Sequence, residues 1–141
     1  VIDFHIKNKD ADIILPSLKL KKISSYNVVK VVADKNKNVL YLSRSKIPHN
    51  FNKKSDYYLK HLSIISFKPE ALKKFSLHPQ TRLEKIEGIE LLRAIEIGLK
   101  IKTIVIKGNS FSVDIKEDFI KAKKFMEKDK LLKLYSKNNN G

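Results

Sequence analysis

The sequence predicts an α/β fold built around a mixed sheet. Segments with the composition of β-strands alternate along the chain with segments of helical periodicity, which is the pattern of a layered α/β domain. Two strand-like runs joined by a short polar connection predict an antiparallel hairpin, and residues 57–67 form a long apolar run. A hairpin beside strands that are separated by helices indicates a sheet with both parallel and antiparallel pairs.

The first half of the chain is predicted to consist mainly of strands. Residues 1–8 have the apolar spacing of a helix end, whereas Pro16 disfavours a helix in the segment that follows. The connection Lys35-Asn36-Lys37-Asn38 is polar and short, so it predicts a hairpin loop. Residues 45–56 contain Pro48 and a lysine pair and predict an exposed loop. The predicted strands are residues 12–20, 28–34 and 39–43.

The second half is predicted to alternate between strands and helices. Pro69 suits the first position of a short helix at residues 69–75. Thr81 begins a longer helix to about residue 97, because Glu84 completes a capping box and Gly98 is a natural stop. Gly108 and Asn109 form a predicted turn. The remaining predicted elements are a buried strand at residues 57–67, a strand at 99–106 and a basic amphipathic helix at 115–134.

Length and composition restrict the class of protein. A chain of 141 residues can form one domain with a real core, which we expect over residues 1–135, followed by a disordered tail at 136–141. The 42% apolar content is that of a globular protein. The absence of cysteine excludes disulfides and thiolate metal sites, and it fits a cytoplasmic location. No apolar run approaches the roughly 18 residues of a membrane span, so no membrane partner is expected.

The charge balance raises nucleic acid as a partner, but the type of basic residue argues against it. The net charge is +15, yet only three of the 30 basic residues are Arg. Arginine is the side chain that reads guanine edges and grips phosphate with two hydrogen bonds. The lysines are scattered along the chain and form no single stripe. We therefore expect no specific nucleic-acid partner, and a basic RNA-binding module stays as an alternative.

Asp114 is the first residue that could carry chemistry. It follows a predicted strand and turn and precedes a helix, with Glu117 and Asp118 close by. A carboxylate in that place can ligate Mg²⁺, which prefers oxygen ligands. The same spacing is that of a capping box, in which Asp is stabilised at the helix N-terminus. Spacing alone favours the cap.

Other candidate groups also have a structural and a functional interpretation. Glu87 and Glu90 lie about one helical turn apart and could both face a cleft, or they could be solvated, with Glu90 pairing with Arg93. His61 lies within an apolar strand and is either a core residue or a site residue. Arg44 follows a strand end, where it could meet an anion or remain on the surface.

Several common sites are missing from the sequence. It has no nucleophile elbow and no pair of histidines with the spacing of metal ligands. Four glycines in the whole sequence nearly exclude a glycine-rich loop that cradles phosphates. Nothing in the sequence therefore predicts a nucleotide site of its own.

Five segments in series resemble one known family. In order and spacing they are similar to the C-terminal portion of the 3-deoxy-manno-octulosonate cytidylyltransferases, also called CMP-Kdo synthetases. The likeness covers about three-quarters of the chain. The segments are V-V-K-V-V at 28–32, L-Y-L-S-R-S-K-I-P at 40–48, Y-L-K-H-L-S-I at 58–64, L-E-K-I-E-G-I-E-L-L-R at 83–93 and V-D-I-K-E-D at 113–118.

The resemblance implies a fold and a reaction. The fold is that of nucleotide-diphospho-sugar transferases, here incomplete because the N-terminal nucleotide-binding part has no counterpart. The implied reaction transfers CMP from CTP to 3-deoxy-D-manno-octulosonate (Kdo), releases pyrophosphate, needs Mg²⁺ and serves lipopolysaccharide biosynthesis in the cytoplasm. A homodimer is the assembly that the resemblance implies. It also makes Asp114 the metal ligand, and it assigns the sugar-acid pocket to four residues: Arg44, His61, Glu87 and Glu90.

The chain also departs from the family pattern. Leu91 replaces a usual Gln, Ile65 a usual Tyr, and Ile115-Lys116 a usual Thr-Pro. These changes imply a less polar pocket, so a related acid such as a sialic acid or 8-amino-Kdo is an alternative substrate. The phosphate loop and the upstream metal-binding Asp of the family are missing. The chain also opens without Met, and we expect a C-terminal portion that is inactive by itself.

Overall fold

The computed structural model describes residues 1–23, 25–108, 113, 115–129 and 132. The chain divides into two compact units, Val1–Gly108 and Asn109–Gly141. Each unit is described by itself. The single domain expected over residues 1–135 stays a prediction, and the predicted tail at 136–141 lies outside the described residues.

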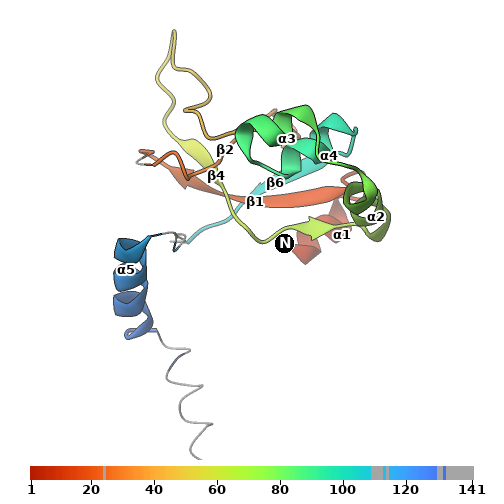
Figure 1. Cartoon of the computed structure of the whole chain (residues 1–141). Coiled ribbons are helices and arrows are strands. Elements are labelled where there is room, and N and C mark those ends of the chain that lie inside the picture. The colour runs from red at the N-terminus through yellow and green to blue at the C-terminus, as the bar shows by residue number, and fades with distance from the viewer. Residues whose placement is uncertain (24, 109–112, 114, 130–131, 133–141) are drawn as a thin grey trace, which may run out of the picture. The chain divides into compact units, whose positions relative to one another are not determined.

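A six-stranded mixed sheet forms the centre of the first unit, as predicted (Figure 1). Its strand order is β3-β2-β4-β1-β5, and β6 pairs with β1 in parallel while all other pairs are antiparallel. The strands are β1 (Ile13–Leu20), β2 (Lys30–Ala33), β3 (Val39–Ser43), β4 (Tyr58–His61), β5 (Ser66–Phe67) and β6 (Ile101–Val105).

The predicted hairpin is formed by β2 and β3, with Val31 opposite Leu42. Its loop is held by the Asp34 carboxylate, which accepts hydrogen bonds from the backbone N–H groups of Asn36 and Asn38, both at 2.8 Å. The side chain of Asn38 donates to the second carboxylate oxygen, also at 2.8 Å. Lys37 adopts a positive φ of 68°, which the short loop requires. The predicted loop at 45–56 contains no helix or strand.

The prediction of one strand over residues 57–67 is wrong, because this run forms two short strands. Both pair with β1: Ser17 lies opposite His61, and Ile14 lies opposite Ser66. Between those pairs the two residues 15–16 of β1 face the four residues 62–65, so the run bulges away from the sheet. Pro16 lacks the N–H that a regular ladder would use there. Ile64 in the bulge is 74% exposed.

The helix predicted over residues 81–97 is also interrupted. It forms α3 (Arg82–Glu87) and α4 (Leu91–Glu96), separated at Gly88, whose φ of +62° is left-handed and ends the first helix. The capping box predicted at Thr81 is present, and the Thr81 N–H donates to Glu84 Oε2 at 3.2 Å.

Two further helices were predicted correctly in type. Helix α1 spans Ile2–Lys7, and α2 spans Pro69–Leu77 with Pro69 at its start. Helices α3 and α4 cover one face of the sheet (Figure 1), and α4 closes the hydrophobic core against β1, β2, β3 and β6. The core includes Ile13, Leu15, Val31, Leu42, Leu92 and Ile101. This packing holds the end of α3 and the start of α4 in place above the strand ends.

The described part of the second unit contains α5 (Lys116–Met126), which is shorter than the helix predicted at 115–134. Residues 127–129 are described but not helical, while residues 130–131 and 133–134 lie outside the described residues. Asn109 of the predicted turn lies outside them as well. Across the described part of the chain, the helices are too short or too polar to cross a lipid bilayer.

Candidate functional site

The four residues predicted to bind substrate gather at one end of the sheet. Strand β3 ends directly before Arg44, and β4 ends at His61. Helix α3 ends at Glu87, and Glu90 directly precedes α4. Because β2 runs antiparallel to both β3 and β4, the C-terminal ends of β3 and β4 lie at the same end of the sheet. Arg44 and Glu87 are in direct contact, and His61 and Glu90 interact electrostatically.

The guanidinium of Arg44 is fixed by backbone carbonyl groups. Its Nε donates to the carbonyl of Glu87 at 3.0 Å and Nη2 to that of Gly88 at 3.2 Å. Nη1 donates to the carbonyl of Asn27 at 3.3 Å. These acceptors use three of the five N–H donors of a guanidinium. Arg44 is thus an ordered cation with donors left for an anion, and it is not a freely solvated surface residue.

The carboxylate of Glu87 holds the end of β3. Oε1 accepts a hydrogen bond from Ser43 Oγ at 2.6 Å, and Oε2 accepts one from the Arg44 N–H at 3.0 Å. The solvated interpretation of Glu87 is therefore wrong. Each carboxylate oxygen can accept a second hydrogen bond, so a contact between Glu87 and the sugar stays a prediction.

His61 presents an unused ring nitrogen. Its Nε2 atom is buried and has no hydrogen-bond partner among the described residues. Burial lowers the pKa of His61, an effect that Glu90 opposes and Lys60 reinforces. The imidazole is therefore neutral near pH 7 and can exchange a hydrogen bond with a hydroxyl group. Buried polar atoms are almost always paired, so the unused Nε2 suits a ligand contact.

Glu90 does not form the ion pair with Arg93 that the spacing allowed. Arg93 pairs with Glu84 instead, through Nη2–Oε1 at 2.7 Å and Nε–Oε2 at 2.8 Å. The guanidinium of Arg93 also lies 4.4 Å from the ring centre of Phe75. Glu84 is therefore a buried structural residue, whereas Glu90 is exposed and carries its charge toward His61.

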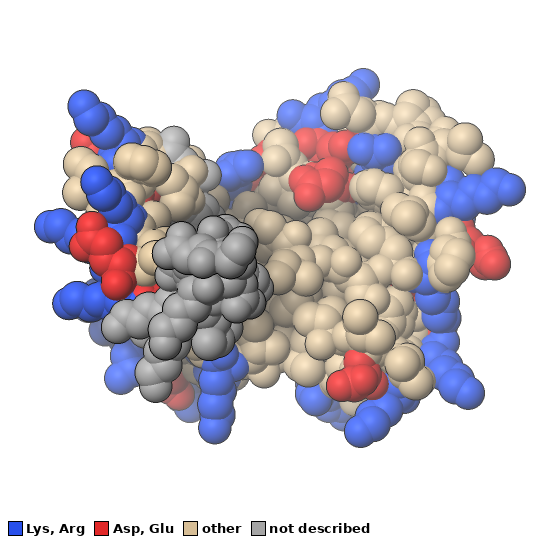
Figure 2. All heavy atoms as spheres, turned by 90° about the horizontal axis from the view of Figure 1, so that it is seen from below, with Lys and Arg blue, Asp and Glu red and all other residues tan. Residues whose placement is uncertain are grey.

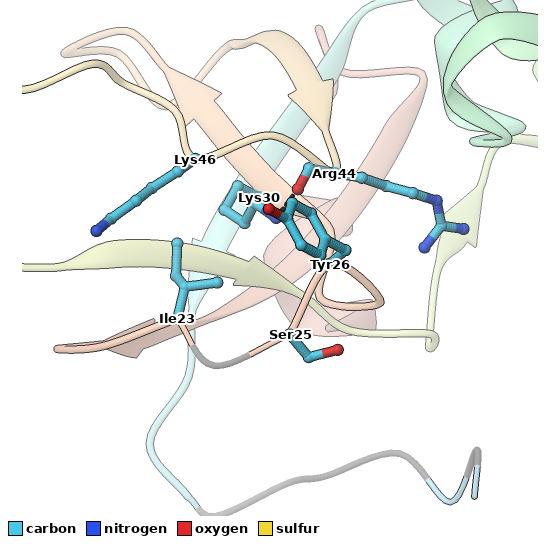
Figure 3. Close-up of a pocket in the computed structure, with 6 residues that line it drawn as sticks. All are labelled: Ile23, Ser25, Tyr26, Lys30, Arg44 and Lys46. Carbon is cyan, nitrogen blue, oxygen red and sulfur yellow. Dashed lines mark hydrogen bonds between the residues drawn. The ribbon is translucent and has the colours of Figure 1, made fainter.

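A cavity of about 220 Å³ lies beside Arg44 (Figure 3). Its lining residues are Ile23, Ser25, Tyr26, Lys30, Arg44 and Lys46. Three of these six residues are cationic, but their charged groups do not converge on the cavity: the Lys30 ammonium donates to two carbonyl groups, and in Figure 3 the charged ends of Arg44 and Lys46 point in opposite directions. Sequence reasoning missed Lys30 and Lys46. The available signal was a lysine in the middle of the β-branched run Val28-Val29-Lys30-Val31-Val32, where a buried charge is unexpected.

The predicted metal ligand is not placed. Asp114 lies outside the described residues. Among the residues that are described, no group of three or more His, Asp or Glu side chains could hold a metal ion. The described side chains therefore do not fit a Mg²⁺ site by themselves, and we derive no chemical step through a metal.

Two of the three departures from the family pattern lie in or against the core, whereas Ile115 of the third is exposed. Leu91 is 1% exposed and belongs to the hydrophobic core cluster. Ile65 is partly buried and packs against the same cluster. Both apolar side chains are thus stabilised by burial where they stand.

Comparisons with known proteins agree on one family. The sequence model of the cytidylyltransferase family matches residues 6–102. The 3-deoxy-manno-octulosonate cytidylyltransferase of Rickettsia prowazekii (strain Madrid E) is 40% identical over 126 residues, which are 88% of this chain and 50% of that protein. The protein of the same name from Thermodesulfovibrio yellowstonii is 43% identical over 104 residues, covering 70% of this chain and 41% of that protein.

A solved structure is similar as well. It is that of CMP:2-keto-3-deoxy-manno-octonic acid synthetase complexed with CTP, with a TM-score of 0.79 and 26% sequence identity. The match covers 89% of this chain and 53% of that one. The chain thus spans about half the length of the relatives it matches. The family match, the shared fold and the five motif segments together show that this chain belongs to the cytidylyltransferase family, alongside the 3-deoxy-manno-octulosonate cytidylyltransferases.

Proposed function

We propose that this chain provides the sugar-acid half of a cytidylyltransferase active site. The complete enzyme would transfer CMP from CTP to Kdo, giving CMP-Kdo and pyrophosphate for lipopolysaccharide biosynthesis. The observation that carries the proposal is the gathering of four residues at one end of the sheet: Arg44, Glu87, His61 and Glu90. The names of the relatives support the same substrate, and the solved relative was complexed with CTP.

The site residues would bind and orient the sugar acid. The ordered guanidinium of Arg44 matches the geometry of a carboxylate. The neutral imidazole of His61 and the exposed carboxylate of Glu90 would exchange hydrogen bonds with the sugar hydroxyls. These contacts would fix the anomeric hydroxyl for attack on the α-phosphate of CTP, with pyrophosphate as the leaving group. Nucleotidyl transfer depends mainly on such positioning and on charge neutralisation.

Other parts of the proposal rest on the resemblance alone. Mg²⁺, with Asp114 as one ligand, would neutralise phosphate charge. A homodimer would be the assembly, and the cytoplasm would be the location, in line with a sequence that has no cysteine. Sedimentation of the chain at several concentrations would test the dimer, and a monomer at every concentration would contradict it.

Two alternative functions are tested by different measurements. The first alternative is that the substrate is another acidic sugar, a sialic acid or 8-amino-Kdo, bound at the same residues. Competition binding against Kdo shows which acid binds more tightly. An RNA-binding module would need a continuous basic face. In Figure 2 Lys and Arg side chains are interspersed with acidic and uncharged residues and form no single patch, which does not favour RNA.

The direct test is titration of the 141-residue chain with Kdo, followed by NMR. We expect signals of residues 43–45, 61 and 87–90 to shift, and sialic acid and 8-amino-Kdo to shift them less at equal concentration. A mixed-sequence RNA serves as the control for general attraction to cations. Shifts only with RNA, or equal shifts with every anion, would contradict the proposed function.

A further inference from the structure

Arg44 lies just beyond the end of a β-ladder. Ser43 pairs with Lys30 as the last residue of β3, so the peptide groups of Arg44 have no partner strand. Backbone N–H and C=O groups near a protein interior need hydrogen-bond partners. Two side chains of opposite charge provide them here. The carboxylate of Glu87 accepts from the Arg44 N–H at 3.0 Å, and the ammonium of Lys30 donates to the Arg44 carbonyl.

Lys30 is an unusual residue for this task because it is almost completely buried. Its relative exposure is 1%, and its Nζ also donates to the carbonyl of Val28 at 2.6 Å. Burial lowers the pKa of Lys30, while the nearby charge of Glu87 opposes that effect and Arg44 adds to it. Removing an ammonium group from water is costly, so an apolar side chain would be the more stabilising choice for a purely structural position.

The side chains of Lys30 and Arg44 point in different directions, and this indicates different roles. In Figure 3 the ammonium of Lys30 lies at the carbonyl oxygen of Arg44, whereas the Arg44 guanidinium extends away from it. The guanidinium ends at the carbonyls of Glu87, Gly88 and Asn27. Lys30 therefore acts on the main chain of Arg44 and not on the group that would meet an anion.

We propose that Lys30 is a positioning residue of this site: with Glu87 it holds both peptide groups of Arg44 and thereby sets the direction of the guanidinium toward the sugar-acid carboxylate. The identity of that ligand rests on the proposed function, whereas the clamp on Arg44 does not. A merely structural Lys30 would change the stability of the sheet when replaced, and it would leave Arg44 ordered in every variant that folds.

The test compares Lys30→Met with Lys85→Met in the 141-residue chain. Methionine keeps the length of the side chain and removes its charge and donors, and Lys85 is an exposed lysine on α3. The first measurement needs no ligand: hydrogen exchange at Arg44 Nε–H and at the Arg44 amide, followed by NMR. We expect exchange about tenfold faster or more in Lys30→Met, as loss of a charged hydrogen bond implies, and no change in Lys85→Met. Unchanged Arg44 exchange in a folded Lys30→Met chain would overturn the proposal.

The second measurement is the dissociation constant for Kdo. We expect Lys30→Met to weaken binding about tenfold, which is the size of one charge-assisted contact, and Lys85→Met to leave it within twofold. If the unsubstituted chain does not bind Kdo, the proposed function fails while the exchange measurement still decides the role of Lys30. If Lys30→Met does not fold, the role of Lys30 is tested in the unsubstituted chain by the exchange of its ammonium protons with water, followed by NMR. A slowly exchanging signal supports the clamp, and a signal lost to rapid exchange contradicts it.

Discussion

At the scale of single residues, the site depends on which group each of three glutamates contacts. Glu84, Glu87 and Glu90 are spaced three apart and look equivalent in sequence, yet each has a different environment. Glu84 is buried against Arg93, Glu87 holds the end of β3, and Glu90 is exposed. Only Glu90 fits the solvated position that spacing suggested for the group, and its charge lies near His61.

The pair of Glu84 and Arg93 predicts a stability that depends on pH. The hydrogen bond from Arg93 lowers the pKa of Glu84 below its ordinary value of 4.5, although burial opposes this. The stabilisation is therefore complete above about pH 4.5 and is lost as the pH falls through the lowered pKa. Glu84→Gln should reduce the free energy of unfolding by about 2–3 kcal/mol at pH 7 and by progressively less below pH 4.5.

Urea unfolding of both chains at several pH values measures this difference. Glu96→Gln, on the neighbouring helix, serves as a control because the Glu96 side chain accepts a hydrogen bond from the Leu83 N–H at the exposed start of α3. If the free energies of unfolding of Glu84→Gln and the unsubstituted chain differ by the same amount down to pH 3, the charge of Glu84 is not the cause of the stabilisation.

Asp114 gives the sharpest test of the metal proposal. In a polypeptide that joins this chain to the nucleotide-binding half of a relative, Asp114→Asn should lower the rate about a hundredfold or more, because the proposed metal ligand would be lost. Asparagine can still cap a helix, so folding should survive. Pyrophosphate release at rising Mg²⁺ concentrations is the measurement. A rate within a few-fold of the parent would favour the capping interpretation.

At the scale of elements, the break between α3 and α4 positions the site. Gly88 has a φ of +62°, a conformation that costs other residues roughly 1–2 kcal/mol. Its carbonyl accepts from Arg44 Nη2, so the break places one of the three carbonyls that hold the guanidinium. A continuous helix over residues 81–97 would use that carbonyl within the helix and would not present it to Arg44.

Gly88→Ala should lower the free energy of unfolding by about 1 kcal/mol through backbone strain. A Cβ at Gly88 would lie 4.0 Å from Arg44 Nε, which is ordinary contact, so strain and not a clash is the cause. Gly98→Ala is a matched control, because Gly98 also has a positive φ, of 79°, and a Cβ added there would meet no atom within 4 Å. Both variants should lose similar stability, and only Gly88→Ala should weaken Kdo binding. Equal effects on binding would contradict a role of Gly88 in placing Arg44.

At the scale of the whole molecule, the proposed sugar-acid site stands in a sequence without a glycine-rich phosphate loop. The chain has four glycines and no glycine-rich motif, and it spans about half the length of its relatives. We therefore expect the 141-residue chain to release no pyrophosphate from CTP in the presence of Kdo and Mg²⁺. Measurable release above a no-enzyme control would show that this chain contains a complete site.

The sequence by itself determined the fold class, the β2–β3 hairpin, the capping box at Thr81 and the family, because these depend on local pattern and on motif order. It did not predict the bulge at 62–65 or the break at Gly88, where pairing with β1 and a left-handed glycine override local periodicity. Only the tertiary structure showed that Arg93 pairs with Glu84 and that Lys30 and Glu87 hold Arg44. Such contacts join residues distant in sequence, and their partners are set by how helices pack on strand ends.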